Sequence, residues 1–160
     1  MGSAARELLA PVADVWGFLA EPYHLSDWWP GVTGVEPDTR GFAQGARWKV
    51  TVVDGGASRG GGFFNLPPMG TPGGPRVPQI LEITSLVPPE RWSFRLVREK
   101  SDRPTDVTVR LAACGSDRTL ATIEIDVPRS GLFSRSSQSG RLAERAVDRL
   151  YDLVQTAATL

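Results

Sequence analysis

APVADVWGFLAEPYHLSDWWPGVTGVEPD, residues 10–38, contains the signals on which the interpretation of the whole chain depends. Pro11 suits the first position of a helix and Pro22 ends it, and a second short helix is expected to end at Pro30. The valine-rich segment after Pro30 is predicted as a strand, and a short apolar strand is expected at residues 6–11. Between the first two prolines, apolar residues recur at helical spacing: Val12, Val15, Trp16 and Leu19.

Downstream of this stretch, five runs alternate between apolar and polar residues, as strands with one buried face do. ARWKVTVV (46–53) places Trp48 and Val50 on one face, and RWSFRLVRE (91–99) does the same with Trp92 and Phe94. The turns between these runs are short and polar, apart from one long glycine-rich segment, which predicts an antiparallel meander. The other three runs cover residues 79–87, 105–113 and 119–127.

One long amphipathic helix is predicted near the end of the chain, over about residues 137–157. It is the only predicted element long enough to cover the buried face of the sheet. The predicted fold is therefore α+β, a curved antiparallel sheet of about seven strands around a C-terminal helix, in one domain spanning residues 1–160. The apolar stripe of this helix contains Leu142, Ala146, Val147, Leu150, Leu153, Val154 and Ala157.

The order of these elements resembles the SRPBCC superfamily, also called START-like or helix-grip, which includes polyketide cyclase/dehydrase proteins and the major birch pollen allergen. LVPPERWSF (86–94) resembles the family's Pro-Pro-x-Arg hairpin, and GSDRTLATIEIDV (115–127) resembles its Gly-x-x-x-Thr entry to the last strand. The resemblance spans almost the whole chain and implies the helix-grip fold, but not one function, because the family hosts carriers, cyclases and hydrolases. Its opening motif is matched by Ala10-Pro11, Val15-Trp16 and Trp28-Trp29-Pro30.

A ligand site is expected between the concave face of the sheet and the last helix. One helix cannot fill a strongly curved sheet, so some aromatic rings are expected to line a mostly apolar cavity; the alternative for each ring is a place in a filled core. Of the adjacent Trp28 and Trp29, one is expected to be buried and the other to lie near the opening. The predicted ligand-binding residues are Trp29, Trp48, Val50, Phe63, Phe64, Trp92, Phe94, Leu142, Ala146 and Leu150.

Residues 54–78 are predicted to form a long loop rich in glycine and proline. The segment lacks the Gly-x-x-x-x-Gly-Lys-Ser/Thr pattern of a phosphate-binding loop, and a strand rather than a helix follows it. Two interpretations stay open: a flap that closes Phe63 and Phe64 over an apolar ligand, or an insertion whose phenylalanines cover a sheet edge. Deleting residues 60–74 and measuring ligand affinity would distinguish them.

Residues able to perform chemistry are few. The chain has one histidine, His24, and one cysteine, Cys114, so it cannot supply the three or four Cys/His ligands of a zinc site. His24 has only Asp27 nearby and is interpreted as a surface residue, and Cys114 as a structural thiol. No catalytic residue, cofactor or metal is therefore predicted.

The charge pattern and hydropathy limit the partners further. The formal net charge is zero and the two signs are interleaved, which does not indicate a nucleic-acid partner. No apolar run approaches the roughly 20 residues of a transmembrane helix, and no signal peptide is recognised, so a cytoplasmic location is expected. The sequence leaves monomer and homodimer open.

The leading functional hypothesis is binding of a hydrophobic small molecule, such as a lipid, a polyketide or an aromatic metabolite. A polyketide cyclase/aromatase-type enzyme is the second hypothesis, and a protein- or membrane-interaction module without a small ligand is the third. Polar groups that point into the cavity would favour the enzyme, an apolar cavity the carrier, and a filled core the interaction module.

Overall fold

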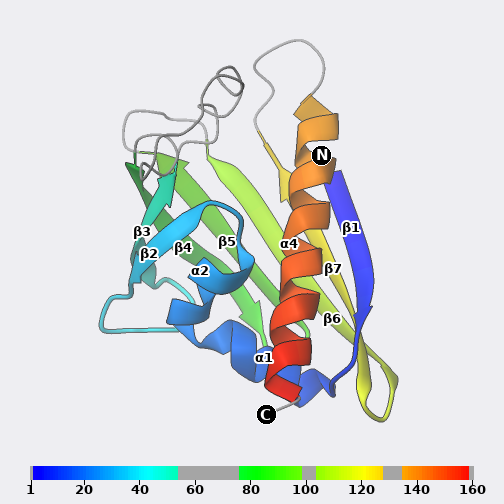
Figure 1. Ribbon diagram of the computed structural model, residues 1–160. Coiled ribbons are helices and arrows are strands. Elements are labelled where there is room, and N and C mark those ends of the chain that lie inside the picture. The colour runs from blue at the N-terminus through cyan, green and yellow to red at the C-terminus, as the bar shows by residue number, and fades with distance from the viewer. Residues whose placement is uncertain (1, 54–75, 99–103, 128–134, 159–160) are drawn as a thin grey trace.

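The predicted α+β class and seven-stranded sheet are confirmed by the structure, a computed structural model that describes residues 2–53, 76–98, 104–127 and 135–158. The strands form one antiparallel sheet in the order β1-β7-β6-β5-β4-β3-β2, so that the first strand pairs with the last (Figure 1). The strands are β1 (Gly2–Leu8), β2 (Val32–Glu36), β3 (Arg47–Val53), β4 (Arg76–Val87), β5 (Arg91–Arg98), β6 (Thr105–Gly115) and β7 (Arg118–Asp126).

Two strand boundaries differ clearly from those predicted. The first strand ends at Leu8 instead of continuing to Pro11, and β4 already begins at Arg76, because Arg76 pairs with Val53. Residues 76–78, which were predicted to belong to the long loop, therefore form the start of β4. The rest of that loop, residues 54–75 with Phe63 and Phe64, lies outside the described residues. The helices are α1 (Val12–Ala20), the single 3₁₀ turn η1 (Pro22–His24), α2 (Leu25–Trp28) and α4 (Arg135–Ala158).

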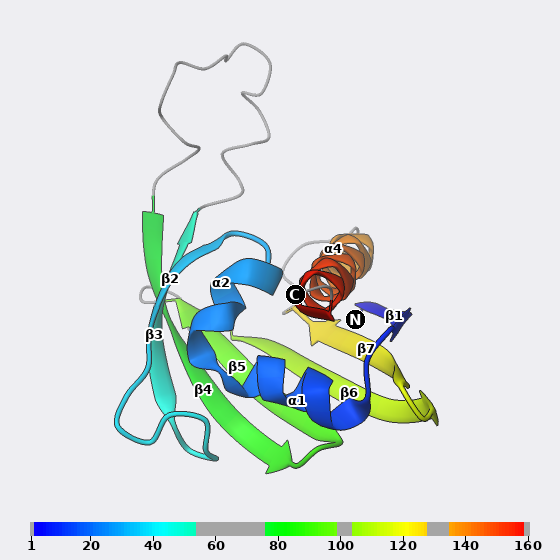
Figure 2. The same ribbon diagram turned by 60° about the horizontal axis from the view of Figure 1, so that its bottom comes forward.

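The helices within the described residues all lie on the concave face of the sheet (Figure 2). Helix α4 packs on β1 and β7 at one side of the sheet and also contacts α2, whereas α2 packs on β2 at the opposite side (Figure 2). Helix α1 crosses below, against β6 and β7. The middle strands β3, β4 and β5 therefore lie between the two places where α4 and α2 rest on the sheet.

The alternation of residues along the strands explains which face is buried. Trp48 and Val50 on β3 are buried, while Lys49 between them is exposed. The outer face carries ion pairs, among them Arg95 to Asp106 at 2.8 Å. Because both of these side chains are about half exposed, the pair contributes at most about 1 kcal/mol to stability. The core under the helices is the main source of stability.

A buried hydroxyl group joins the start of α1 to the last strand. Thr119 on β7 is fully buried, and its Oγ1 donates a hydrogen bond to the carbonyl of Ala10 at 2.8 Å. The next residue, Pro11, accepts the first helical bonds, from the N–H groups of Asp14 and Val15. Thr119 therefore holds the backbone where the chain leaves β1 and turns into α1.

The first strand is attached to α4 as well as to β7. Arg6 forms an ion pair with Asp148 of α4 at 2.8 Å, and its guanidinium lies 3.7 Å from the centre of the Tyr151 ring. Near the other end of the strand, Gly2 approaches the backbone of Gly140 so closely that a Cβ on Gly2 would overlap it.

Among the helices that the structure describes, none combines the length and apolar character needed to span a membrane.

The connection between β2 and β3 is organised by one carboxylate. Asp38 Oδ2 accepts a hydrogen bond from the N–H of Arg47, and Oδ1 accepts from Arg40 and Gly41, over 2.9 to 3.2 Å. These backbone donors, Arg47 first, hold the pKa of the Asp38 carboxyl below its ordinary value of 3.8. This carboxylate orients the segment that carries Phe42.

Replacing Asp38 with asparagine is expected to lower the melting temperature at pH 7, because the amide has only one oxygen to accept bonds that now use two. Since the carboxyl pKa is lower in the folded state, the ionised group stabilises the fold above about pH 4, and this effect is lost as the pH falls through the folded-state pKa. The difference in melting temperature between the two proteins should therefore shrink between pH 5 and pH 2. Thermal unfolding followed by circular dichroism measures it, and a difference that is constant over this range would contradict the prediction.

Candidate functional site

Six aromatic rings form a cluster on the concave face of the sheet, and a seventh, Trp16 of α1, contacts this cluster through Phe42 at 5.6 Å between ring centres. They come from α2, from the β2–β3 connection, from β3 and from β5, and neighbouring rings lie mostly edge to face. The ring centres of Trp92 and Phe94 are 4.7 Å apart, and those of Phe42 and Trp92 are 5.0 Å apart. Such pairs stabilise one another beyond the apolar area that they bury. The cluster consists of Trp28, Trp29, Phe42, Trp48, Trp92 and Phe94.

Trp28, the last residue of α2, and Trp29, which follows it, are both buried, so the prediction that one lies near an opening is wrong. The helix ends after a single turn, and the backbone of Trp29 is extended, with φ −87° and ψ 121°. This change of conformation directs Trp29 onto Phe94, while Trp28 packs on Trp92. Adjacent side chains on a continuing helix would have pointed in different directions, and the early helix end is what brings both rings into the core.

The predicted ligand residues within the described chain fall into two groups. Trp29, Trp48, Trp92 and Phe94 all join the aromatic cluster, and Val50 lies buried on the same face of β3 as Trp48. The second group lies on α4, which packs mainly on β1 and β7. In this second group Ala146 and Leu150 are buried, and Leu142 is partly exposed.

The two buried indole N–H groups of β3 and β5 differ in their hydrogen bonding. Trp48 Nε1 donates to the carbonyl oxygen of Gly41 at 2.7 Å. Trp92 is fully buried, and its Nε1 has no acceptor within the described parts of the chain. Phe42, the half-buried ring beside Trp92, lies between Gly41 and Gly45, which both have positive φ. Sequence reasoning missed Phe42, because nothing in the pattern of residues 37–46 indicates that this ring turns inward.

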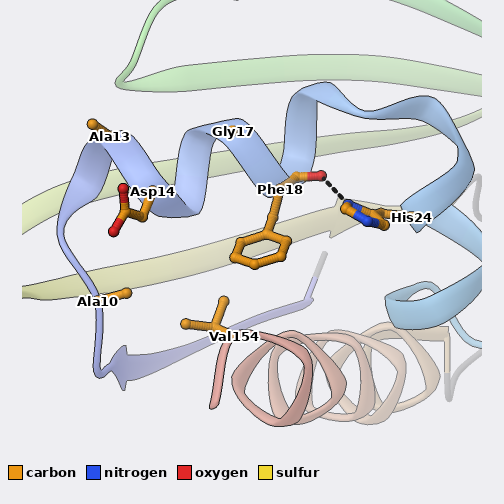
Figure 3. Close-up of a pocket in the computed structure, with 7 residues that line it drawn as sticks. All are labelled: Ala10, Ala13, Asp14, Gly17, Phe18, His24 and Val154. Atoms are coloured by element: carbon orange, nitrogen blue, oxygen red, sulfur yellow. Dashed lines mark hydrogen bonds between the residues drawn. The ribbon is translucent and has the colours of Figure 1, made fainter. Parts of the chain in front are cut away.

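A pocket of about 440 Å³ lies between α1 and the C-terminal end of α4 (Figure 3). His24 is half-buried here, and its Nδ1 lies 3.0 Å from the carbonyl oxygen of Phe18. In the neutral ring this contact places the proton on Nδ1 and leaves Nε2 as an acceptor. Asp14, not Asp27, is the carboxylate that shares a pocket with His24. The lining residues are Ala10, Ala13, Asp14, Gly17, Phe18, His24 and Val154.

A larger pocket, of about 700 Å³, lies over the corner of the sheet formed by β2 to β5. Most of its lining side chains, such as Lys49, Ile80 and Val97, pair across the strands on the face opposite to Trp48 and Leu96. It is therefore mainly a pocket of the convex face. None of the predicted ligand residues within the described chain lines either pocket. The lining residues are Gly34, Val35, Glu36, Lys49, Thr51, Pro78, Gln79, Ile80, Val97 and Arg98.

The thiol and the possible metal ligands do not form a reactive centre. Desolvation and the neighbouring Glu7 carboxylate, 3.5 Å from the sulfur, raise the pKa of the Cys114 thiol, which is the opposite of what activates a nucleophile. In the parts of the chain that the structure describes, no three His, Cys, Asp or Glu side chains gather into a group that could hold a metal ion. The only buried polar side chains described are Thr119 and Ser139.

Comparison with known proteins agrees with this architecture. No curated protein matches the chain. Several solved structures share its fold: a START superfamily protein from Mycobacterium smegmatis is 15% identical, with 97% of each chain covered and a TM-score of 0.66. A conserved protein from Geobacillus kaustophilus is 17% identical, with 98% of this chain and 93% of that one covered and a TM-score of 0.67. A Chromobacterium violaceum protein is also 17% identical, covers 95% and 94%, and has a TM-score of 0.65.

The sequence comparison with family models extends over nearly all of the chain. The model described as "Activator of Hsp90 ATPase homolog 1-like protein" matches residues 9–154, which extend from Leu9, just after β1, to the last turns of α4. The matched region includes both short helices, six of the seven strands in full and the aromatic cluster. The chain therefore belongs to the family of activator of Hsp90 ATPase homolog 1-like proteins, within the SRPBCC or START-like superfamily.

Proposed function

We propose that this protein binds a hydrophobic small molecule, such as a lipid, a polyketide or an aromatic metabolite, between the concave face of its sheet and helices α2 and α4. The START-like fold family commonly binds hydrophobic ligands. The observation that carries the proposal is the convergence of Trp29, Trp48, Trp92 and Phe94 into one cluster on this face. Aromatic side chains supply a large apolar contact area at the cost of few rotatable bonds.

The chemistry of the interior favours a binding protein over an acid–base enzyme. Thr119 and Ser139 are the buried polar side chains within the described residues, and neither is an acid or a base at neutral pH. A cyclase needs groups that move protons beside the bound chain. His24 and Asp14 could do so, but they line the pocket between α1 and α4 and do not belong to the aromatic cluster.

The experiment is mass spectrometry of the freshly purified protein under native and denaturing conditions, followed by titration with naphthalene. A small molecule that is present at 1:1 and is lost on denaturation would support the proposal, as would saturable 1:1 quenching of tryptophan fluorescence by naphthalene. No copurified molecule and no saturable quenching would contradict it.

The close packing of the cluster supports one alternative, a module that recognises another protein. Trp28, Trp48 and Trp92 are at most 1% exposed, as expected for a filled core. The description of the matched family names activation of the Hsp90 ATPase, which is an action on a protein. A protein that neither copurifies with a small molecule nor binds naphthalene would favour this alternative.

Replacing Ala146 with leucine is expected to weaken naphthalene binding about tenfold, because the longer side chain projects from the buried face of α4 into the proposed site. Ala112→Leu, at an exposed position on β6, is the matched control and should leave the affinity unchanged. Both variants are checked for native circular dichroism before the titration. Equal affinity of a folded Ala146→Leu protein and the wild type would show that the ligand does not lie against α4.

A further inference from the structure

The unpaired indole N–H of Trp92 indicates what kind of ligand the proposed site takes; this inference rests on the proposed function. The ring is fully buried, and Nε1 has no hydrogen-bond acceptor within the described residues. Buried polar groups almost always have a partner, and an exception in a native structure calls for a specific explanation. The neighbouring Trp48 follows the rule, with its N–H bonded to the Gly41 carbonyl at 2.7 Å.

Four aromatic rings pack around Trp92, and its cross-strand neighbours on β4 and β6 are the aliphatic residues Leu86 and Val109. The ring centres of Phe94, Phe42, Trp48 and Trp28 lie between 4.7 and 6.1 Å from that of Trp92. An aromatic face is a much weaker acceptor than an oxygen atom, so an N–H that points toward one still gains from an oxygen. Folding has already removed water from this donor. A ligand that supplies an acceptor would therefore add a full hydrogen bond without a further desolvation cost for the N–H group.

We propose that the ligand is a neutral apolar molecule that carries a carbonyl oxygen, and that this oxygen accepts a hydrogen bond from Trp92 Nε1. A carbonyl fits better than a carboxylate, because the buried residues described include no arginine, lysine or histidine that would neutralise a charge. Arg91 has a buried Nε without a partner, but it lies on the opposite face of β5 from Trp92. Aromatic ketones, aldehydes, esters and quinones combine the required acceptor with flat apolar surface.

The oxygen can reach Trp92 from the side of the β2–β3 connection. Phe42 covers Trp92 there and is only half-buried, unlike the fully enclosed rings of Trp48 and Phe94. The glycines at 41 and 45 have φ values of +65° and +89°. Displacement of this one ring would open the Trp92 ring to a ligand from the side of the β2–β3 connection.

The test compares two probes of nearly the same shape, 2-acetylnaphthalene and 2-isopropenylnaphthalene, which differ by an oxygen in place of a methylene group. Their dissociation constants are measured with wild type, Trp92→Phe and Trp48→Phe. The preference for the ketone, expressed as the ratio of the two constants, is expected to fall about tenfold in Trp92→Phe. Trp48→Phe should keep the wild-type ratio, because the Trp48 N–H already bonds to Gly41. The two probes differ in water solubility, but this difference affects every protein equally. It therefore cancels when the ratios of the variants and the wild type are compared.

A second measurement requires only that the wild type binds the probes. In a ¹H–¹⁵N spectrum of the wild type, the indole resonance missing from Trp92→Phe should move downfield with the ketone and not with the alkene. If Trp92→Phe does not fold, each of the other four tryptophans is replaced by phenylalanine in a separate variant. The Trp92 resonance is then the one that is present in all four spectra. Binding of both probes without this shift, or with an unchanged ratio in a folded Trp92→Phe, overturns the inference and leaves the proposed function intact. Failure of the wild type to bind either probe overturns both.

Discussion

Replacing Trp48 with alanine is expected to lower the free energy of unfolding by about 4 kcal/mol, which is the typical loss when a buried tryptophan is truncated. Trp48 is fully buried, and its ring contacts those of Phe42 and Trp92, with centres 6.3 and 6.0 Å away. Its N–H also holds the Gly41 carbonyl, so truncation both opens a cavity and removes a hydrogen bond to the β2–β3 connection. A loss of this size is a large share of the total stability of an ordinary domain.

Urea unfolding followed by far-ultraviolet circular dichroism measures this loss. Trp48→Phe separates its two causes, because it keeps most of the apolar ring but removes the donor to Gly41. Tyr23→Ala is the control: that aromatic side chain is 60% exposed, so its removal should change the stability by less than about 0.5 kcal/mol. If Trp48→Ala cost less than about 1 kcal/mol, the aromatic cluster would not be the close-packed core described here.

Thr119→Val is expected to lower the free energy of unfolding by about 1–3 kcal/mol, although valine has nearly the same shape as threonine. The substitution removes the buried donor to the Ala10 carbonyl and leaves that oxygen without this hydrogen bond at the start of α1. Thr119→Ser keeps the hydroxyl group and should recover a substantial part of the loss.

Thr33→Val is the matched control for this comparison. Thr33 is exposed on the edge strand β2, and its hydroxyl lies at a long 3.4 Å from the Thr51 carbonyl, so the change should be close to neutral. Chemical denaturation of the four proteins in parallel gives the required differences. Equal stability of Thr119→Val and Thr33→Val would mean that the hydroxyl at position 119 contributes no more than an exposed one.

Much of the fold could be predicted because the signals that specify it are local. Alternation along β3 and β5 correctly placed Trp48, Trp92 and Phe94 on the buried face, and apolar spacing correctly predicted α4. The boundaries were less accurate, since they depend on pairing partners. Arg76 joins β4 because Val53 lies across from it, and no pattern around residue 76 reveals that neighbour.

The candidate site could be predicted only in part, because it depends on contacts between distant segments. The sequence placed three of the aromatic residues, Trp48, Trp92 and Phe94, on the correct faces, but Phe42 and the early end of α2 before Trp29 became apparent only in three dimensions. The role of Thr119 is similar: its motif was noted in the sequence, yet its partner, Ala10, is more than a hundred positions away. Likewise, nothing local in the sequence indicates that His24 and Asp14 line the same pocket between α1 and α4.

The pairing of the first strand with the last has a consequence for how the chain assembles during translation. Gly2 lies opposite Ile125 and Leu8 opposite Thr119, so β1 leaves the ribosome long before its only neighbour in the sheet exists. The hairpins from β3 to β7 join segments that are close in the chain and can form early, whereas the docking of β1 must wait for both β7 and α4. Until then Leu8 and the unpaired backbone of β1 stay exposed, so this strand is open to pairing with other chains for as long as synthesis continues.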